Sequence, residues 1–214
     1  MTTLNEQAYE HLKKMISDQH LSYHQIYSET KLAKELGISR TPFRDAIHRL
    51  VQEGYIDIIP SKGFRLHQLT RQDVVETFQV RSALETYCTM EIARNCNSRR
   101  AKQLFRELGS IMEEMKKILD TTQSIQEFSD YDFQFHTAVI RYLDNRQFSA
   151  IFDTFMYRMQ RLAAMSLSHK GRMKDTYQEH LAILQAMESG DVSHIYEITL
   201  RHMDVPRGIN LEDL

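Results

Sequence analysis

The sequence predicts a mainly α-helical protein with an N-terminal winged helix-turn-helix and a C-terminal all-α, antiparallel six-helix bundle. Two observations favour long helices: seven glycines and three prolines are few for 214 residues, and runs of β-branched residues are missing after residue 70. A third observation is the segment YIDIIPSKGFRLHQL (55–69), which alternates apolar and polar residues as strands do. The expected domains are therefore residues 1–68 and residues 69–214.

Composition limits the class of protein. Apolar residues make up 42% of the chain and charged residues 26%, as in a soluble globular protein with a real core. No apolar stretch approaches the ~20 residues needed to cross a bilayer. The start MTTLNEQAYEHLKK lacks the features of a secretory signal, so we expect a cytoplasmic location and reduced thiols at Cys88 and Cys96. With 27 basic and 29 acidic residues, no global field attracts nucleic acid or membrane.

Three short helices are expected before residue 55. The first is marked by apolar residues at four-residue spacing, namely Leu4, Ala8, Leu12 and Ile16. Ser28 can cap the second helix, and Gly37 ends it. For the third helix, Thr41 is the expected N-cap, Pro42 the first helical residue and Gly54 the stop.

The order of helix, glycine turn and helix is the helix-turn-helix pattern. The outward face of the third helix carries polar residues, namely Arg40, Thr41, Arg44, His48 and Arg49. An arginine fork can bond a guanine edge or clamp a phosphate, and base contacts concentrate in the first turn of a recognition helix. A hairpin with Lys62 and Arg65 near its tip follows and can reach the backbone. The alternative is a packing domain with a solvated arginine face, but the order of elements favours DNA binding.

From Thr70 onward, helical periodicity predicts successive helices with short breaks between them. Their expected spans are 70–96, 98–120, 124–143, 146–168, 172–189 and 191–204. Short connections join antiparallel neighbours, which predicts an antiparallel bundle. The last ten residues contain Pro206 and Gly208, and we expect a loose tail there.

Asp132 and His136 are four residues apart, so both project from one helical face and can reach one ion. Alone, the pair is weak evidence, because such a histidine is more often a hydrogen-bonded core residue. His180 lies ten residues before the expected turn at Gly190 and His202 twelve after it, which places both at similar height on neighbouring helices. One carboxylate and three imidazoles suit a divalent transition metal, Zn²⁺ or Ni²⁺ before Mn²⁺ or Fe²⁺, and leave a position for a water or substrate oxygen.

The first domain resembles a known family. The run SETKLAKELGISRTPFRDAIHRLVQEGYIDIIPSKGF (28–64) is similar to the winged helix of GntR-type bacterial transcription regulators, most specifically in SRTPFRDAI (39–47). The resemblance implies a homodimer on a pseudo-palindromic DNA operator. It places Arg40, Arg44 and Gly63 at the DNA and Thr41, Arg49 and Lys62 close to it. The segment LSYHQIYS (21–28) departs from the family in lacking a Pro-Gly pair.

The second domain resembles the FCD effector domain of the FadR-like GntR branch. The resemblance is carried by VRSALE (80–85), DFQFHTAV (132–139), EHLAILQAMESGD (179–191) and LRHMD (200–204). It implies a metal held by Asp132, His136, His180 and His202. It also implies a small organic acid as effector, with Arg81 as a candidate to bind the acid. The alternative for that arginine is a structural i, i+4 pair with Glu85.

The leading functional hypothesis is a ligand-responsive transcription regulator, most often a repressor in this family, and not an enzyme. In the second hypothesis, the Asp/His₃ centre is the active site of a metal-dependent enzyme that activates water. A third is an architectural DNA binder that responds to no effector. Operator binding that fails in Arg44→Ala while metal content stays intact would favour the regulator over the enzyme.

Overall fold

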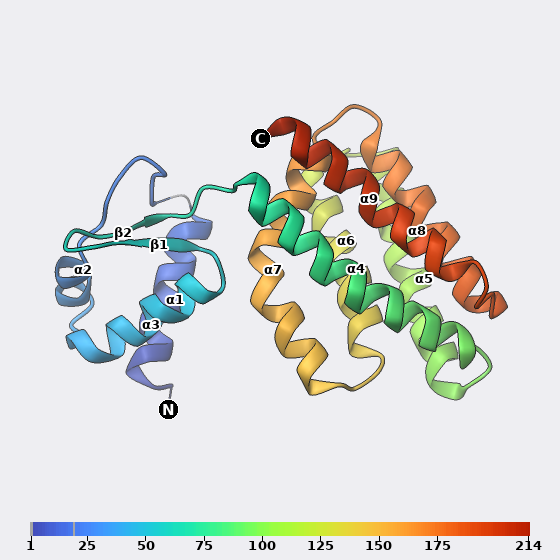
Figure 1. The fold of residues 1–214 in the computed structure, drawn as a ribbon, viewed down its shortest axis with the longest axis horizontal. Coiled ribbons are helices and arrows are strands. Elements are labelled where there is room, and N and C mark those ends of the chain that lie inside the picture. Colours follow the sequence, from blue (N-terminus) through green and yellow to red (C-terminus); the bar gives the residue numbers. More distant parts are fainter. Residues whose placement is uncertain (1, 19) are drawn as a thin grey trace. The chain divides into compact units, whose positions relative to one another are not determined.

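The computed structural model describes residues 2–18 and 20–214 and divides into two compact units, Met1–Leu69 and Thr70–Leu214. Figure 1 shows a small unit of short helices with a two-stranded hairpin and a larger unit of long helices. The mainly α-helical fold class is confirmed. Among the described residues, every helix is too short or too polar to span a bilayer.

The smaller unit consists of α1 (Leu4–Ser17), α2 (Glu29–Glu35), α3 (Arg40–Gln52), β1 (Ile56–Ile59) and β2 (Gly63–Leu66). Its two strands are antiparallel, with Ile56 opposite Leu66 and Ile59 opposite Gly63. Helix α1 packs against α3, and the apolar side chains between the elements are buried, including Leu12, Ile47 and Phe64. The winged helix-turn-helix expected from the sequence is therefore present.

The start of α3 differs from the expectation. The helix begins at Arg40 with Ser39 as its N-cap, so Thr41 is the second helical residue and Pro42 the third. Proline is tolerated there because the first backbone N–H groups of a helix have no intrahelical partner. The N-cap assignment to Thr41 was wrong, and the correction moves Arg40 into the first turn of the helix.

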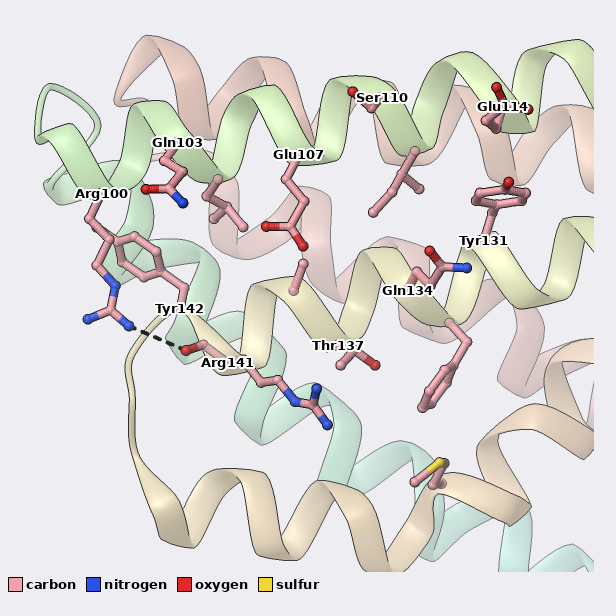
Figure 2. Close-up of a pocket in the computed structure, with 15 residues that line it drawn as sticks. Arg100, Gln103, Glu107, Ser110, Glu114, Tyr131, Gln134, Thr137, Arg141 and Tyr142 are labelled. Carbon is pink, nitrogen blue, oxygen red and sulfur yellow. Dashed lines mark hydrogen bonds between the residues drawn. The ribbon is translucent and has the colours of Figure 1, made fainter.

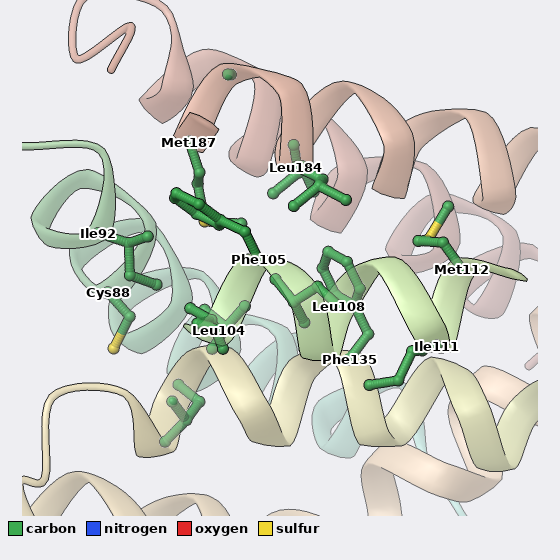
Figure 3. Close-up of a cluster of buried hydrophobic side chains, with 14 of the residues drawn as sticks. Cys88, Ile92, Leu104, Phe105, Leu108, Ile111, Met112, Phe135, Leu184 and Met187 are labelled. Carbon is green, nitrogen blue, oxygen red and sulfur yellow. The ribbon is translucent and has the colours of Figure 1, made fainter. Parts of the chain in front are cut away.

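In the larger unit, all of which is described, six helices form the predicted bundle: α4 (Arg71–Arg94), α5 (Arg99–Asp120), α6 (Ile125–Arg141), α7 (Arg146–Leu167), α8 (Arg172–Ser189) and α9 (Ile195–Asp213). Each break has a local cause. Ser98, Ser124 and Asn145 accept backbone N–H groups as N-caps, and Gly190 ends α8 in the left-handed conformation. Figure 3 shows the apolar core, where side chains of α4, α5, α6 and α8 meet.

The expectation of a loose tail was wrong, because α9 continues to Asp213. Pro206 lies inside the helix without ending it. The fully buried Asn210 donates from its side-chain nitrogen to the carbonyl of Leu162 on α7 at 3.1 Å. Tertiary contacts of this kind outweigh the low helix propensity of proline and glycine in this segment.

Candidate metal centre and candidate DNA-contact surface

Three helices of the bundle bring the four predicted ligands together. Helix α6 supplies Asp132 and His136, α8 supplies His180 and α9 supplies His202. The Nε2 atoms of the three imidazoles lie 3.2, 3.2 and 3.3 Å from one another, and all three rings are buried. Nitrogens bound to one ion at ~2.1 Å in tetrahedral geometry are about 3.4 Å apart. The spacing therefore fits a single shared ion.

Hydrogen bonds on the far sides of two rings fix how they face the centre. The Nδ1 atom of His136 lies 2.5 Å from Oε2 of Glu85, and Nδ1 of His202 lies 2.7 Å from Oε2 of Glu179. Because an ionised carboxylate only accepts hydrogen bonds, each Nδ1 donates, and each Nε2 then presents a lone pair. Lone pairs facing each other across this distance repel unless a cation lies between them.

Asp132, the fourth predicted ligand, lies beside two of the three imidazoles. One of its carboxylate oxygens lies 3.5 Å from Nε2 of His180 and 3.8 Å from Nε2 of His136. The ring of His180 stacks on Phe135 with centroids 4.3 Å apart, and its Nδ1 is buried without a hydrogen-bond partner. Three imidazoles and one carboxylate form a donor set suited to a divalent transition metal. Among the described residues, the three histidines form a group with metal-binding geometry.

Two arginines support the carboxylates behind the histidines. Arg81 donates from Nε to Glu85 at 2.9 Å, and Arg172 binds Glu179 through both terminal nitrogens at 2.6 and 2.7 Å. The Arg81–Glu85 pair, given above as the alternative role for this arginine, therefore exists, and Arg81 also lines the cavities beside the candidate metal centre. Sequence reasoning missed Glu85 as a partner of His136, and it missed Glu179 and Arg172 altogether. The helical i, i+4 spacing gave no indication of these pairs. Glu85 and Glu179 bind histidines on other helices, and Arg172 lies seven residues before Glu179.

Electrostatics follow from this arrangement. Burial acts to raise the pKa of Glu85, but electrostatic interactions and hydrogen bonds with His136 and Arg81 lower it to about 2. Burial also acts to raise the pKa of Glu179, and the hydrogen bonds from His202 and Arg172 lower it to about 2. Burial lowers the pKa of His180 well below its usual value, and electrostatic interactions with the neighbouring histidines and with Arg81 and Arg172 lower it further. Glu85 and Glu179 are therefore held ionised as acceptors for the two histidines, and His180 is held neutral, the form in which an imidazole binds metal.

Two small cavities adjoin the centre, with volumes of about 10 and 20 Å³. Arg81, Asp132 and His136 line both. The larger cavity is also lined by Arg172 and by other polar residues. In that lining, three buried polar atoms have no hydrogen-bond partner: Ser166 Oγ, Thr176 Oγ1 and Arg172 Nε. Buried polar groups are normally paired, so these atoms indicate a place for water or for ligand oxygens.

A much larger groove lies elsewhere on the bundle. It encloses about 910 Å³ over α5, α6 and α7, and none of the predicted site residues lines it. Figure 2 shows Arg100 and Glu107 on one side and Gln134, Thr137 and Arg141 on the other. The volume of a cavity alone therefore does not locate the candidate metal centre. That centre is recognised by the polar side chains that point toward one another.

The predicted DNA-contact residues divide into two groups. Arg40, Thr41 and Arg44 are exposed on the first turns of α3, and Lys62 is exposed in the hairpin turn. Arg49 is engaged within its own unit. Its guanidinium lies 3.6 Å from the centre of the Tyr9 ring and forms ion pairs with Glu6 at 3.1 Å and Glu53 at 3.0 Å. The structure thus assigns Arg49 a packing contact between α1 and α3.

Gly63 has a conformational reason to be glycine. Its φ is +128°, and a Cβ at this position would lie 2.0 Å from the carbonyl oxygen of Tyr27. The neighbouring Phe64 exchanges both backbone hydrogen bonds with Tyr27, at 2.7 and 3.0 Å. The wing is thereby held against the segment before α2, and any side chain at residue 63 would disturb it.

Comparison with known proteins gives matches in both units. Residues 4–66 match the family model described as bacterial regulatory proteins, gntR family, and residues 76–205 match the FCD domain. The gluconate operon transcriptional repressor of Bacillus licheniformis is 28% identical over 163 residues, which is 76% of this chain. That match spans 64% of the repressor's own length.

Two solved structures have a similar fold. The E. coli protein McbR/YncC aligns with a TM-score of 0.73 at 18% identity, covering 100% of this chain and 99% of that one. The metal-free FCD domain of TM0439 aligns with a TM-score of 0.56 at 17% identity, covering 68% of this chain and 96% of that domain. At these identities the likeness concerns the fold.

Proposed function

This chain belongs to the GntR family of bacterial regulatory proteins and carries an FCD domain, and on this premise we propose that it is a metal-containing, acid-responsive transcription regulator that binds operator DNA. The observation that carries the proposal is the convergence of three buried imidazole Nε2 atoms within 3.3 Å beside Asp132. The relative named above is a repressor, which favours repression here as well.

Asp132, His136, His180 and His202 would hold the ion, with Zn²⁺ or Ni²⁺ preferred for an imidazole-rich set. A bound ion would supply a positive charge and an open coordination position for a carboxylate oxygen. Glu85 and Glu179 orient His136 and His202 through their Nδ1 atoms. The residues of the centre therefore fit the ion in geometry, tautomer and charge.

The effector is a small organic acid. Arg81 lines both cavities beside the centre and offers terminal nitrogens toward an anion, while Arg172, Ser166 and Thr176 offer further donors in the larger one. The cavities are small, so an acid of a few heavy atoms would enter only with rearrangement of the neighbouring side chains. Such a rearrangement links ligand binding to the packing of the bundle.

DNA is bound through the first two turns of α3, where Arg40, Thr41 and Arg44 are exposed, with Lys62 in the wing reaching the DNA backbone. The protein would act as a homodimer on a pseudo-palindromic operator, because two-fold related half-sites match a two-fold protein. The acid changes DNA affinity only to the extent that it binds two arrangements of the dimer with different affinity.

The alternative of a metal-dependent enzyme is less well supported. The matching relative is named as a repressor, and the two family matches together span most of the chain. The exposed arginines of α3 would also have no purpose in an enzyme of the bundle alone. Hydrolytic turnover that disappears in His180→Ala would nevertheless favour the enzyme.

The experiment compares the wild-type protein with the double variant His180→Ala, His202→Ala. DNA selected from a random-sequence library serves as operator, with affinity measured by fluorescence anisotropy and metal measured by elemental analysis. We expect stoichiometric metal and acid-dependent affinity in the wild type. The double variant should contain no metal and bind DNA without responding to any acid of a panel. Normal metal content in the double variant would remove the proposed site.

A further inference from the structure

The C-terminal end of α9 extends beyond the family match. The FCD match ends at residue 205, whereas α9 continues through Asp213. We name the segment Pro206–Asp213 the C-terminal strap. It is two more helical turns on the same helix that carries His202. The strap is therefore attached directly to one of the candidate metal ligands.

Side chains fasten the strap to three places in the bundle. The buried Asn210 donates to the carbonyl of Leu162 on α7 at 3.1 Å. Asp213 pairs with Nε2 of His169, in the connection between α7 and α8, at 2.9 Å. Arg71, the first residue of α4, donates to the backbone carbonyl of Leu211. The strap thus bridges the end of α7 and the beginning of α4.

The beginning of α4 is where the chain arrives from the winged unit. Thr70 caps the helix in a capping box with Asp73, and only residues 67–69 separate this cap from the end of β2. Asp73 is in turn 3.6 Å from Arg158 on α7. Figure 1 shows the C-terminal end of α9 beside the first turn of α4. A shift of the strap would therefore displace the first turn of α4, which directly follows the residues that connect the two units.

Pro206 makes the strap depend on these contacts. Proline has no backbone N–H, so the carbonyl of His202, four residues earlier, lacks its usual intrahelical donor. The metal-bearing turn and the strap are joined by one hydrogen bond fewer than in an ordinary helix. Leu211 lies nine residues after His202, or about 13 Å along the helix axis. The position of the strap is therefore set jointly by His202 and by Arg71, Asn210 and Asp213.

We propose that the C-terminal strap couples the position of His202 to the first turn of α4, with the Arg71–Leu211 hydrogen bond as the connecting contact. The direction of signalling rests on the proposed function, in which metal and acid act at His202. The coupling itself is a property of the bundle and exists without either ligand. Thermodynamic linkage requires it to act both ways, so a change at Arg71 must be detectable at His202.

The test uses hydrogen–deuterium exchange with mass spectrometry on the full chain and on Arg71→Ala. The matched control is Arg99→Ala, which removes an exposed arginine from the same first position of α5. In metal-free protein, we expect Arg71→Ala to speed exchange in the strap and in the turn around His202, while Arg99→Ala leaves both unchanged. Faster exchange confined to residues 71–75 would overturn the proposal.

A second measurement adds Zn²⁺ alone to each protein. In the wild type, zinc should slow exchange around His202 and also at residues 67–76, and in Arg71→Ala the second effect should disappear. By linkage, Arg71→Ala should weaken zinc affinity about fivefold, at the lower end of typical coupling. Equal zinc affinity of the two proteins, together with equal protection of residues 67–76 from exchange, would overturn the proposed coupling through the strap. If the wild-type protein binds no zinc, the proposed metal site is wrong. The exchange measurement on metal-free protein still tests the coupling through the strap in that case.

Discussion

The side chain of Glu179 binds a residue that is far away in the sequence. It precedes His180 directly, yet its carboxylate accepts from Nδ1 of His202 on another helix and from Arg172. The carboxylate therefore orients His202, a candidate metal ligand, across the α8–α9 hairpin. Since its charge is balanced by Arg172, the group can remain ionised while it is half-buried.

Replacing Glu179 by Gln should lower metal affinity 10- to 100-fold, because the amide is a weaker acceptor for His202 and can also present a donor. Competition with a chromophoric chelator measures the affinity directly. Glu188→Gln, an exposed position on the same helix, is the control for charge removal. If both variants bind metal like the wild type, the orientation of His202 does not depend on this carboxylate.

At the scale of elements, the wing owes its position to the contact between β2 and the segment before α2. Gly63 opens β2 with φ of +128° and no room for a Cβ, whereas Gly37 has φ of +65° with nothing within 4 Å. Comparing the two glycines therefore separates the cost of a positive φ from the cost of a steric clash with a neighbouring backbone. Both adopt a conformation that costs other residues ~1–2 kcal/mol, but only Gly63 is also limited by a neighbouring backbone.

Gly63→Ala should consequently destabilise the winged unit by clearly more than Gly37→Ala, for which about 1 kcal/mol is expected from the backbone conformation. Urea denaturation of each variant compares the free energies of unfolding. DNA affinity should fall together with stability in Gly63→Ala, because the wing is displaced. Equal losses of stability in the two variants would show that the backbone at Tyr27 moves aside easily.

Elements also show where sequence reasoning succeeds and fails. Helices α4 to α8 were predicted to within two residues at each end, because apolar periodicity and caps such as Ser98 and Ser124 act locally. The sixth helix was expected at 191–204 and instead spans Ile195–Asp213. The strap was predicted to be loose, since Pro206 and Gly208 are poor helix formers. Its helical conformation comes from the hydrogen bond of Asn210 to Leu162 and other contacts with α4 and α7, which no local pattern reveals.

For the whole molecule, a formal net charge of −2 provides no general attraction for DNA. In the proposed function, DNA binding therefore comes from the local set of exposed residues on α3 and the wing. Each phosphate contact nevertheless releases counterions, so affinity still falls with salt in proportion to the number of contacts. The overall charge of the chain and the salt dependence of DNA binding are separate properties.

We expect DNA affinity to fall steeply as the salt concentration rises from about 50 to 200 mM. Arg44→Ala should weaken binding, and if Arg44 contacts a phosphate, the slope of log affinity against log salt should decrease by about one. Fluorescence anisotropy at several salt concentrations measures both quantities. Arg106→Ala on α5, also exposed, should leave both unchanged. A flat salt response in the wild type would contradict docking of the winged helix on DNA.

Residue order alone was enough for the helix-turn-helix, for helices α4 to α8 and for the expectation that Asp132, His136, His180 and His202 meet, because periodicity, caps and hairpin spacing are short-range properties. That these four side chains bind a metal stays a prediction. Helix packing was needed to show that Glu85 and Glu179 orient His136 and His202, that Arg49 packs on Tyr9, and that the strap meets Arg71. These partners lie on different elements or far apart along the chain. Their meeting depends on how the helices are rotated and aligned, which is set by burial over the whole core.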